Sequence, residues 1–240
     1  MLGALKYYTS RCMESPQNIP RDDLAELPLF PLNNVVLFPG MRLPLHIFEE
    51  RYKSMIGECS RRDAPFGVLL IKEGQEVGDP AEPVRVGTTA RITQVQQLQE
   101  GRMNIMTLGE RRFEVVEIVQ QVPHLVGLVR YLEEEAEEVS DALLSDVRDE
   151  YATFLRHQAT IAGGWNNRLD VTSDPLQLSA QAMSSLASSI ELPRDLRQQL
   201  LETTTARERL EKLLPLLKRG NQLMQEQAEQ SNPFRGSRLN

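Results

Sequence analysis

Residues Leu27–Cys59 read LPLFPLNNVVLFPGMRLPLHIFEERYKSMIGEC, and their pattern changes halfway along. Up to Leu45, prolines alternate with large apolar residues, and a proline confines a strand to a sheet edge or a bulge because it lacks a backbone N–H. From about His46, apolar residues recur at spacings of three and four, as on an amphipathic helix. The stretch therefore predicts short strands over 35–38 and 41–45, followed by one helix, and it contains no nucleophile or phosphate-loop pattern.

Five further apolar segments have the length of strands and are separated by turn residues. They are 66–71, 87–98, 102–108, 112–119 and 125–132. Several are rich in Val, Ile and Thr, which is typical of strands. Glu100 and Gly101 predict a hairpin turn, and Gly109 is expected to break a strand. Short strands, hairpins and one early helix predict a mostly antiparallel β-barrel or sandwich.

The second half of the chain shows helical patterns after the acidic run EEEAEE at 133–138. Capping residues predict three helix starts: Ser140, Asp174 followed by Pro175, and Thr205 paired with Glu208. Pro215 is expected to kink the last helix or to reset its first turn. After Gly220 the chain is polar and is expected to fray. The second half is therefore a predicted bundle of three to four helices.

The predicted fold class is α+β, with a β pseudo-barrel followed by a C-terminal helical bundle. The expected organisation is a disordered N-terminal tail (1–26), a β-rich subdomain (27–132), a helical subdomain (133–219) and a flexible C-terminal tail (220–240). Met13 is an alternative to Met1 as the translation start, because nothing before it has a structured pattern.

Composition restricts the compartment and the class of partner. The 240 residues carry a net charge of −7, and an acidic surface repels phosphate backbones, so nucleic acid is a poor default partner. No apolar run reaches the roughly 18 residues that cross a bilayer. The two cysteines, Cys12 and Cys59, do not make a disulfide framework. We expect a cytoplasmic protein with no membrane contact.

Three segments resemble one family in the right order. Residues 27–52 (LPLFPLNNVVLFPGMRLPLHIFEERY), 86–118 (VGTTARITQVQQLQEGRMNIMTLGERRFEVVEI) and 197–217 (RQQLLETTTARERLEKLLPLL) are similar to the N-terminal substrate-binding domain of Lon, the ATP-dependent protease. The resemblance implies a PUA-like β pseudo-barrel followed by helices. It also implies a module that binds unfolded or degron-like protein segments, linked to proteolysis or quality control, with a protease or chaperone as an expected partner.

Enzymatic activity is not expected to accompany the resemblance. No segment matches the G-x-x-x-x-G-K-[ST] phosphate loop, and the chain looks like the Lon domain without its ATPase and peptidase domains. His46, His124 and His157 fall in three separate predicted elements, without the spacing of a metal site. We therefore expect no catalytic residues, no metal and no cofactor. A small-molecule enzyme with a pocket between barrel and bundle is a disfavoured alternative.

The prolines and large apolar residues of 27–59 cannot all be internal, which suggests a surface for other polypeptides. Residues expected in the core are Leu29, Leu32, Val36, Leu45 and Phe48. Candidate contacts with a client are Phe30, Phe38, Met41, Met103 and Met106, and methionine suits varied partners because its side chain is flexible. Such a surface would bind an unfolded segment by apolar contact or by strand addition.

RNA binding is the main alternative function, because PUA-like folds can bind RNA. Arg102, Arg111 and Arg112 form the only basic cluster predicted on the barrel. A structural role for these arginines, paired with nearby glutamates, is the competing interpretation. Aromatic residues make up 5% of the chain, and none is interleaved with this cluster as RNA-stacking surfaces require.

Overall fold

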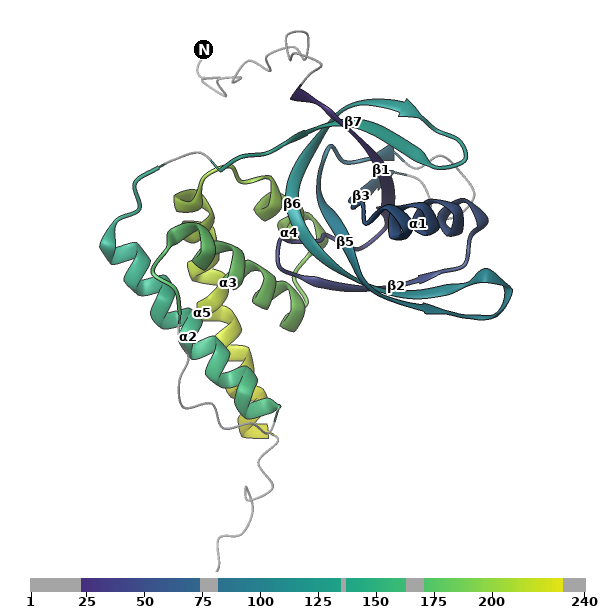
Figure 1. The fold of residues 1–240 in the computed structure, drawn as a ribbon. Helices are drawn as coiled ribbons and strands as arrows, with labels where there is room; N and C mark the ends of the chain where they lie inside the picture. The colour runs from purple at the N-terminus through teal and green to yellow at the C-terminus, as the bar shows by residue number, and fades with distance from the viewer. Residues whose placement is uncertain (1–22, 74–81, 135–136, 163–170, 231–240) are drawn as a thin grey trace, which may run out of the picture.

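The computed structural model describes residues 23–73, 82–134, 137–162 and 171–230, which form a β-barrel and a bundle of helices (Figure 1). The barrel comprises β1 (Ala25–Leu32), β2 (Arg42–Ile47), α1 (Glu50–Arg62), β3 (Phe66–Glu73), β4 (Glu82–Pro83), β5 (Val86–Gln97), β6 (Met103–Gln120) and β7 (Leu125–Tyr131). The bundle comprises α2 (Asp141–Ile161), α3 (Pro175–Ser189), α4 (Arg194–Glu202) and α5 (Ala206–Gln230). The predicted α+β class, with a β pseudo-barrel before a helical bundle, is confirmed.

A parallel strand pair closes the sheet into a barrel. The hydrogen-bonded order is β1-β7-β6-β5-β3-β4, and β1 also pairs with β3 in parallel, with Leu29 opposite Gly67. Because parallel neighbours need a crossover, the chain between them carries β2 and α1. In the part of the chain that the structure describes, β2 pairs with β6 alone, so β2 is an edge strand.

The strand β6 is longer than predicted because Gly109 does not break it. Residues 103–108 of β6 pair with β2 and residues 113–120 pair with β7, while β5 pairs along residues 103–114 on the other side of β6. A Cβ atom on Gly109 would lie 2.3 Å from the carbonyl oxygen of Phe38, so glycine is needed here for a close approach of two backbones. Residues 35–38, predicted as a strand, form a buried irregular connection to β2.

Helix starts lie where the capping residues predicted them. The Ser140 and Asp174 side chains each accept the backbone N–H three residues further on, at 3.3 and 2.7 Å. Thr205 does the same at the start of α5, at 3.1 Å. These bonds satisfy N–H groups that have no partner inside the helix. At the hairpin between β5 and β6, Glu100 and Gly101 have positive φ, and the predicted turn is confirmed.

The last helix does not restart at Pro215, and it continues past Gly220. Pro215 lies inside α5, and the helix runs through Gly220 to Gln230. The prediction that the chain frays after Gly220 is therefore wrong over the rest of this helix. A Cβ atom on Gly220 would lie 2.6 Å from Cδ1 of Ile190 and 3.0 Å from Cε2 of Phe154. Glycine permits close packing of α5 on the other helices here and does not mark a helix end.

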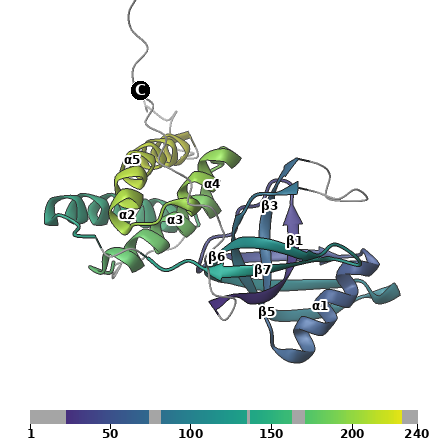
Figure 2. The same cartoon turned by 90° about the horizontal axis from the view of Figure 1, so that it is seen from above.

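The barrel and the bundle share one apolar core cluster. Val36, Phe38 and Leu70 of the barrel pack in the same cluster as the buried faces of the helices. A second cluster lies between α1 and the inner face of the strands. The two lobes lie side by side, and α1 lies at the end of the barrel away from the bundle (Figure 2). Among the helices that the structure describes, none is long and apolar enough to cross a membrane.

Candidate functional site

A shallow groove of about 780 Å³ lies on the outer face of the ribbon formed by β2, β6 and β5. Three consecutive residues of each strand line it: 44–46 of β2, 94–96 of β5 and 104–106 of β6. Residues paired across neighbouring strands share a face of the sheet, so the pairing register decides which of these side chains point outward together. The groove therefore has a floor three strands wide.

Two rows of side chains form this floor. The Met106 row consists of Pro44, Met106 and Gln94, and the Asn104 row consists of His46, Asn104 and Gln96. Within the Asn104 row, Nδ1 of His46 lies 2.7 Å from Oδ1 of Asn104, and Nδ2 of Asn104 donates to Oε1 of Gln96 at 3.2 Å. The rows therefore differ in chemistry, because one is centred on a thioether and the other on hydrogen-bonding groups.

The groove offers apolar surface and hydrogen-bonding groups without formal charge. None of the described residues lining it is Lys, Arg, Asp or Glu. At the end of β2, Phe48 is 51% exposed, and its ring lies 6.0 Å from that of His46 at an interplanar angle of 25°. The exposed Phe48 and the half-buried Met106 therefore place apolar groups on this face, which is typical of a contact surface for another molecule.

The five residues predicted to contact a client divide between core and surface. Phe30, Phe38 and Met103 are buried in the apolar core clusters, which corrects the prediction that they line a surface. Met41 is half-buried and packs against both of the larger clusters. Of the five, Met106 lines the groove. Met103 and Met106 are three residues apart on one strand, so they face opposite sides of the sheet.

Several groove residues were not predicted from the sequence. Pro44, His46 and Asn104 alternate with buried neighbours along β2 and β6, and this period of two was the available signal. Phe48 was expected in the core as part of the helix. Instead, α1 begins at Glu50, so Phe48 lies before the first turn and its side chain is exposed.

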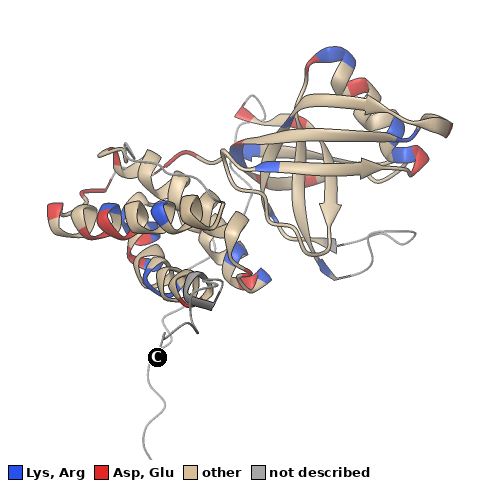
Figure 3. Ribbon diagram, turned by 90° about the horizontal axis from the view of Figure 1, so that it is seen from below, with Lys and Arg blue, Asp and Glu red and all other residues tan. Residues whose placement is uncertain are grey.

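The predicted arginine cluster does not form one basic surface. The Arg111 guanidinium lies 4.0 Å from the ring centroid of Tyr131, whereas Arg102 lies at the hairpin, 3.6 Å from the Glu100 carboxylate. Nine residues of extended strand separate these two arginines by roughly 30 Å. Acidic and basic positions are interspersed over both lobes (Figure 3). The structure thus gives the RNA-binding alternative no continuous basic patch at these residues.

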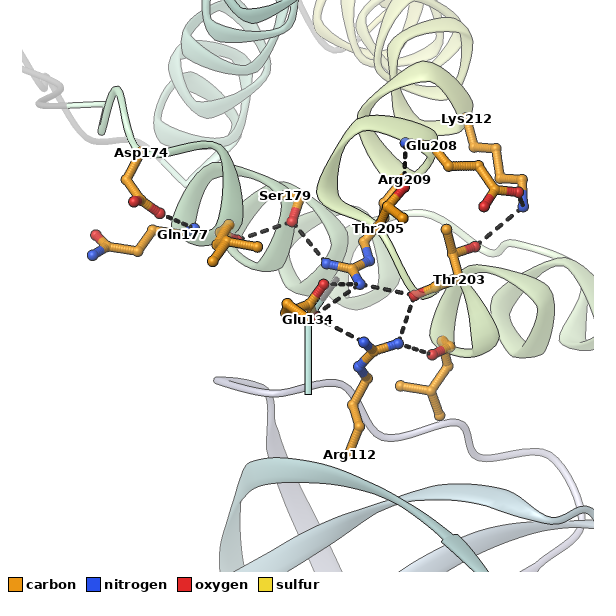
Figure 4. Close-up of polar contacts among 12 residues, drawn as sticks. Arg112, Glu134, Asp174, Gln177, Ser179, Thr203, Thr205, Glu208, Arg209 and Lys212 are labelled. Carbon is orange, nitrogen blue, oxygen red and sulfur yellow. Dashed lines mark hydrogen bonds and ion pairs between the residues drawn. The ribbon is translucent and has the colours of Figure 1, made fainter. Parts of the chain in front are cut away.

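Arg112 is buried at the junction of the two lobes, which corrects its assignment to an RNA surface (Figure 4). Its Nη1 donates to the carbonyl oxygens of Leu201 at 2.7 Å and Thr203 at 2.6 Å, and its Nη2 donates to Glu134 at 2.9 Å. Burial lowers the Arg112 pKa, and the nearby Arg209 charge lowers it further. Arg112 therefore joins β6 to the end of α4.

Glu134 is shared between Arg112 and a second buried arginine, Arg209 of α5. Nη2 of Arg209 donates to both Glu134 carboxylate oxygens, at 2.9 and 2.7 Å, and to the Thr203 carbonyl at 2.8 Å. Its Nη1 donates to Oγ of Ser179 in α3 at 2.9 Å. We call Arg112, Glu134 and Arg209 the junction cluster; it joins the barrel, the connection to α2, and three helices.

Two smaller hollows lie between the β1–β2 connection and the helices. One of about 400 Å³ lies between Pro39–Gly40 and the side chains of α2 and α3, including Tyr151. The other, of about 620 Å³, lies between Asn34 and the α3–α4 connection. Across it, Nη2 of Arg197 donates to the Asn34 carbonyl at 3.0 Å. These hollows lie between barrel and bundle, where the disfavoured small-molecule alternative places its pocket.

The titratable groups usually found in catalytic sites do not converge. His46 lies on β2, His124 in the β6–β7 turn and His157 on α2. Over the described ranges, no group of three or more His, Cys, Asp or Glu is placed to hold a metal ion. Cys59 lies on the buried face of α1, and burial raises its pKa to about 11, so the thiol is protonated at neutral pH.

Comparison with known proteins points to a single family. The model of the ATP-dependent protease La (LON) substrate-binding domain matches residues 26–219. The Lon protease of Anaeromyxobacter dehalogenans is 27% identical over 88% of this chain and 25% of its own length. Lon protease 2 of Myxococcus xanthus is 28% identical over 88% of this chain and 26% of its own length. The chain thus spans about a quarter of these curated relatives.

Solved structures agree with this comparison. The Lon N-terminal domain protein from Xanthomonas campestris has a TM-score of 0.58 and 28% identity, covering 80% of this chain and 98% of that one. The N-terminal domain of a Mycobacterium avium complex Lon protease has a TM-score of 0.57 and 22% identity, covering 81% and 98%, and shows the same fold. The chain belongs to the ATP-dependent protease La (LON) substrate-binding domain family.

Proposed function

We propose that this chain is a non-enzymatic polypeptide-binding module that takes up unfolded or degron-like segments of other proteins. The observation that carries the proposal is the exposed groove on the β2–β6–β5 face, where Met106 and Phe48 offer apolar surface beside hydrogen-bonding side chains. Segments that are buried in a folded client become available to such a surface when the client unfolds. The module would therefore select unfolded clients over folded ones, because only unfolded clients expose these segments.

Binding at this groove should be weak and reversible. The groove is shallow, and a flexible client loses conformational entropy when it is ordered on a surface. A dissociation constant on the order of 10–100 μM, or about −7 to −5.5 kcal/mol, is the expected range for a short segment. Weak binding suits a module that surveys many clients and releases them to another protein.

We further propose that the bound client is passed to a protease or chaperone partner in the cytoplasm. The support is the family, because the relatives with matching segments are named Lon proteases. Those relatives are about four times as long as the matched region, so their proteolytic activity is not assigned to this chain. The proposed division of labour is that this chain binds the client and a partner cuts or refolds it.

Co-retention with a model client tests the proposal. The immobilised full chain is incubated with a reduced and alkylated, permanently unfolded protein, and in parallel with the native form of the same protein. We expect retention of the unfolded form, no retention of the native form, and no cleavage of the client with or without ATP. Equal retention of both forms, or cleavage of the client by the purified chain, would contradict the proposal.

A further inference from the structure

The groove and its two ends present three kinds of chemistry at four successive positions along the strands. On the outward side of β2, Arg42 comes first, followed by Pro44 in the Met106 row and His46 in the Asn104 row, and Phe48 lies beyond the strand. Outward side chains of a strand are two residues, or roughly 6.8 Å, apart. The surface therefore changes from cationic to apolar, then to hydrogen-bonding, then to apolar again.

An extended client lying along these strands would present its own side chains at the same spacing. Every second side chain of the client faces the groove, so successive facing residues meet successive rows. We infer that the groove recognises an extended segment with an acidic residue, an apolar residue, an amide or hydroxyl residue and a second apolar residue at positions i, i+2, i+4 and i+6. This inference rests on the proposed function, because it specifies the client of the same surface.

The central positions of the client must be uncharged. No Lys, Arg, Asp or Glu is found among the described residues lining the groove, so a charged client residue would lose water there without gaining a counter-ion. At the third position, Asn104 and Gln96 are already bonded to each other through one N–H, which leaves further amide donors and acceptors for the client. Amide and hydroxyl side chains can use those groups.

Charge is accommodated at the Arg42 end. Arg42 is exposed and no acidic partner for it is found among the residues that the structure describes. By contrast, Arg91, which pairs with Leu108 on the other side of β6, forms an ion pair with Glu110. A carboxylate on the client at this position would complete an ion pair. Because the pair would be solvent-exposed, it should strengthen binding by roughly two- to fivefold at low salt.

The free edge of β2 favours this face-on mode over strand addition. Pro44 lies in the middle of the edge strand and has no N–H to donate to an added strand. A proline on an edge is one of the features that prevent pairing with another chain. The client is therefore held by side-chain contacts across the groove, with few bonds to the β2 backbone.

Fluorescence anisotropy with labelled peptides tests the inference on the full chain. One peptide carries aspartate, leucine, glutamine and leucine at alternate positions separated by serine. Matched peptides have the same composition in shuffled order, or lysine or glutamate in place of the central glutamine. We expect the ordered peptide to bind at least about tenfold more tightly than the others, a difference of about 1.4 kcal/mol.

Matched protein variants locate the binding. Met106→Asp should weaken binding of the ordered peptide by about tenfold or more, and Asn104→Ala provides a second, exposed test position should Met106→Asp fail to fold. Val122→Asp is the control, because Val122 is 80% exposed on the distant β6–β7 hairpin, and it should leave binding unchanged. Arg42→Gln should remove the salt dependence of peptide binding, together with the gain in affinity that the aspartate of the peptide provides.

The outcomes separate this inference from the proposed function. If the shuffled and centrally charged peptides bind as well as the ordered one while unfolded clients are still retained, the inference fails and the proposed function stands. The inference also fails on its own if peptide binding is unchanged in Met106→Asp and Asn104→Ala. If neither peptides nor the unfolded client bind, the proposed function itself fails.

Discussion

The groove and the junction cluster occupy two parts of the same strand and use opposite chemistry. Near its start, β6 contributes Asn104 and Met106 to an open surface whose lining carries no formal charge. Six residues after Met106, the same strand contributes Arg112 to a buried cluster with two guanidinium groups and one carboxylate. The guanidinium groups of the junction cluster donate hydrogen bonds within the molecule and so hold the fold. Exposed groove side chains that keep further hydrogen-bonding groups are available to a partner.

This contrast also separates stability from function. The side chains of Arg112 and Arg209 are 3% and 2% exposed, and each makes several hydrogen bonds within the chain. Replacing such groups should reduce stability, because the bonded partners are left buried and unsatisfied. Outward groove residues make few contacts inside the molecule. Replacing them should change binding and leave the free energy of unfolding almost unaltered.

Glu134→Gln should have the largest effect on stability. The carboxylate is the counter-ion shared by two buried arginines, and its loss leaves both positive charges uncompensated. We expect the free energy of unfolding, measured by urea denaturation, to fall by about 3–5 kcal/mol. Glu133→Gln, at the exposed neighbouring position, is the control and should change it by less than about 0.5 kcal/mol. Equal effects at the two positions would refute the role assigned to the cluster.

Methionines 103 and 106 provide a matched pair on the two faces of β6. Met103 is 5% exposed and packs in the core, so Met103→Ala should cost about 2–4 kcal/mol of unfolding free energy. Met106 faces the groove, so Met106→Ala should cost about 0.5 kcal/mol or less. Binding of the unfolded client should show the opposite order: Met106→Ala should weaken it more than Met103→Ala, provided that both variants are folded. A large stability loss in Met106→Ala would show that its side chain supports the core.

Alkaline pH should destabilise the barrel behind the groove through Cys59. Burial raises the thiol pKa from 9.0 to about 11, so the folded state holds this proton more tightly than the unfolded chain does. The stabilisation that the protonated thiol gives the folded state is therefore fully present below about pH 9 and is lost as the pH rises to about 11. The free energy of unfolding should fall by at most about 2.7 kcal/mol over this range.

The Cys59 effect is isolated by comparing two proteins at two pH values. Urea denaturation of the native chain and of Cys59→Ala is measured near pH 8 and near pH 10.5. The packing cost of the substitution is common to both conditions, so only the pH-dependent difference reports the thiol. We expect the native chain to lose more stability than the variant on going to the higher pH. Parallel losses in the two proteins would count against a buried, protonated thiol.

Arg111→Gln should have the smallest effect. Its guanidinium stacks on Tyr131 at an exposed site, where a cation–π contact contributes about 0.5–1 kcal/mol. In a gel-shift assay, neither the native chain nor the Arg102→Gln/Arg111→Gln double variant should retain RNA. A salt-dependent shift of the native chain that disappears in the double variant would instead favour the RNA-binding alternative and place a functional surface outside the groove.

Much of the fold followed from short-range patterns. The apolar face of α1 was predicted from residues spaced by three and four, and its members Tyr52, Met55, Ile56 and Cys59 are buried. Helix starts were predicted because a capping side chain bonds to the backbone three residues away. Of the residues predicted to contact a client, Met106 lies in the groove. Met103 was predicted beside it because both are flexible methionines, although the period of two on β6 places their side chains on opposite faces.

Other features depended on contacts between distant segments. Gly109 and Gly220 were expected to end elements, yet each permits a close approach to a segment far away in the chain, Phe38 in one case and Ile190 in the other. Arg112 was predicted on a basic surface, because the residues that bury it lie about 20 and 90 positions further along the chain. No local pattern contains such partners.

The sequence by itself determined the barrel-and-bundle architecture, the helix caps and the family, because these depend on periodicity, capping chemistry and motif order within short windows. The tertiary structure alone decided which apolar residues are core and which line the groove. It also placed Arg112, predicted on the surface, in the buried junction cluster. The physical reason is that burial and charge pairing depend on which distant strands and helices come together, and the pairing of β2, β5 and β6 created the groove.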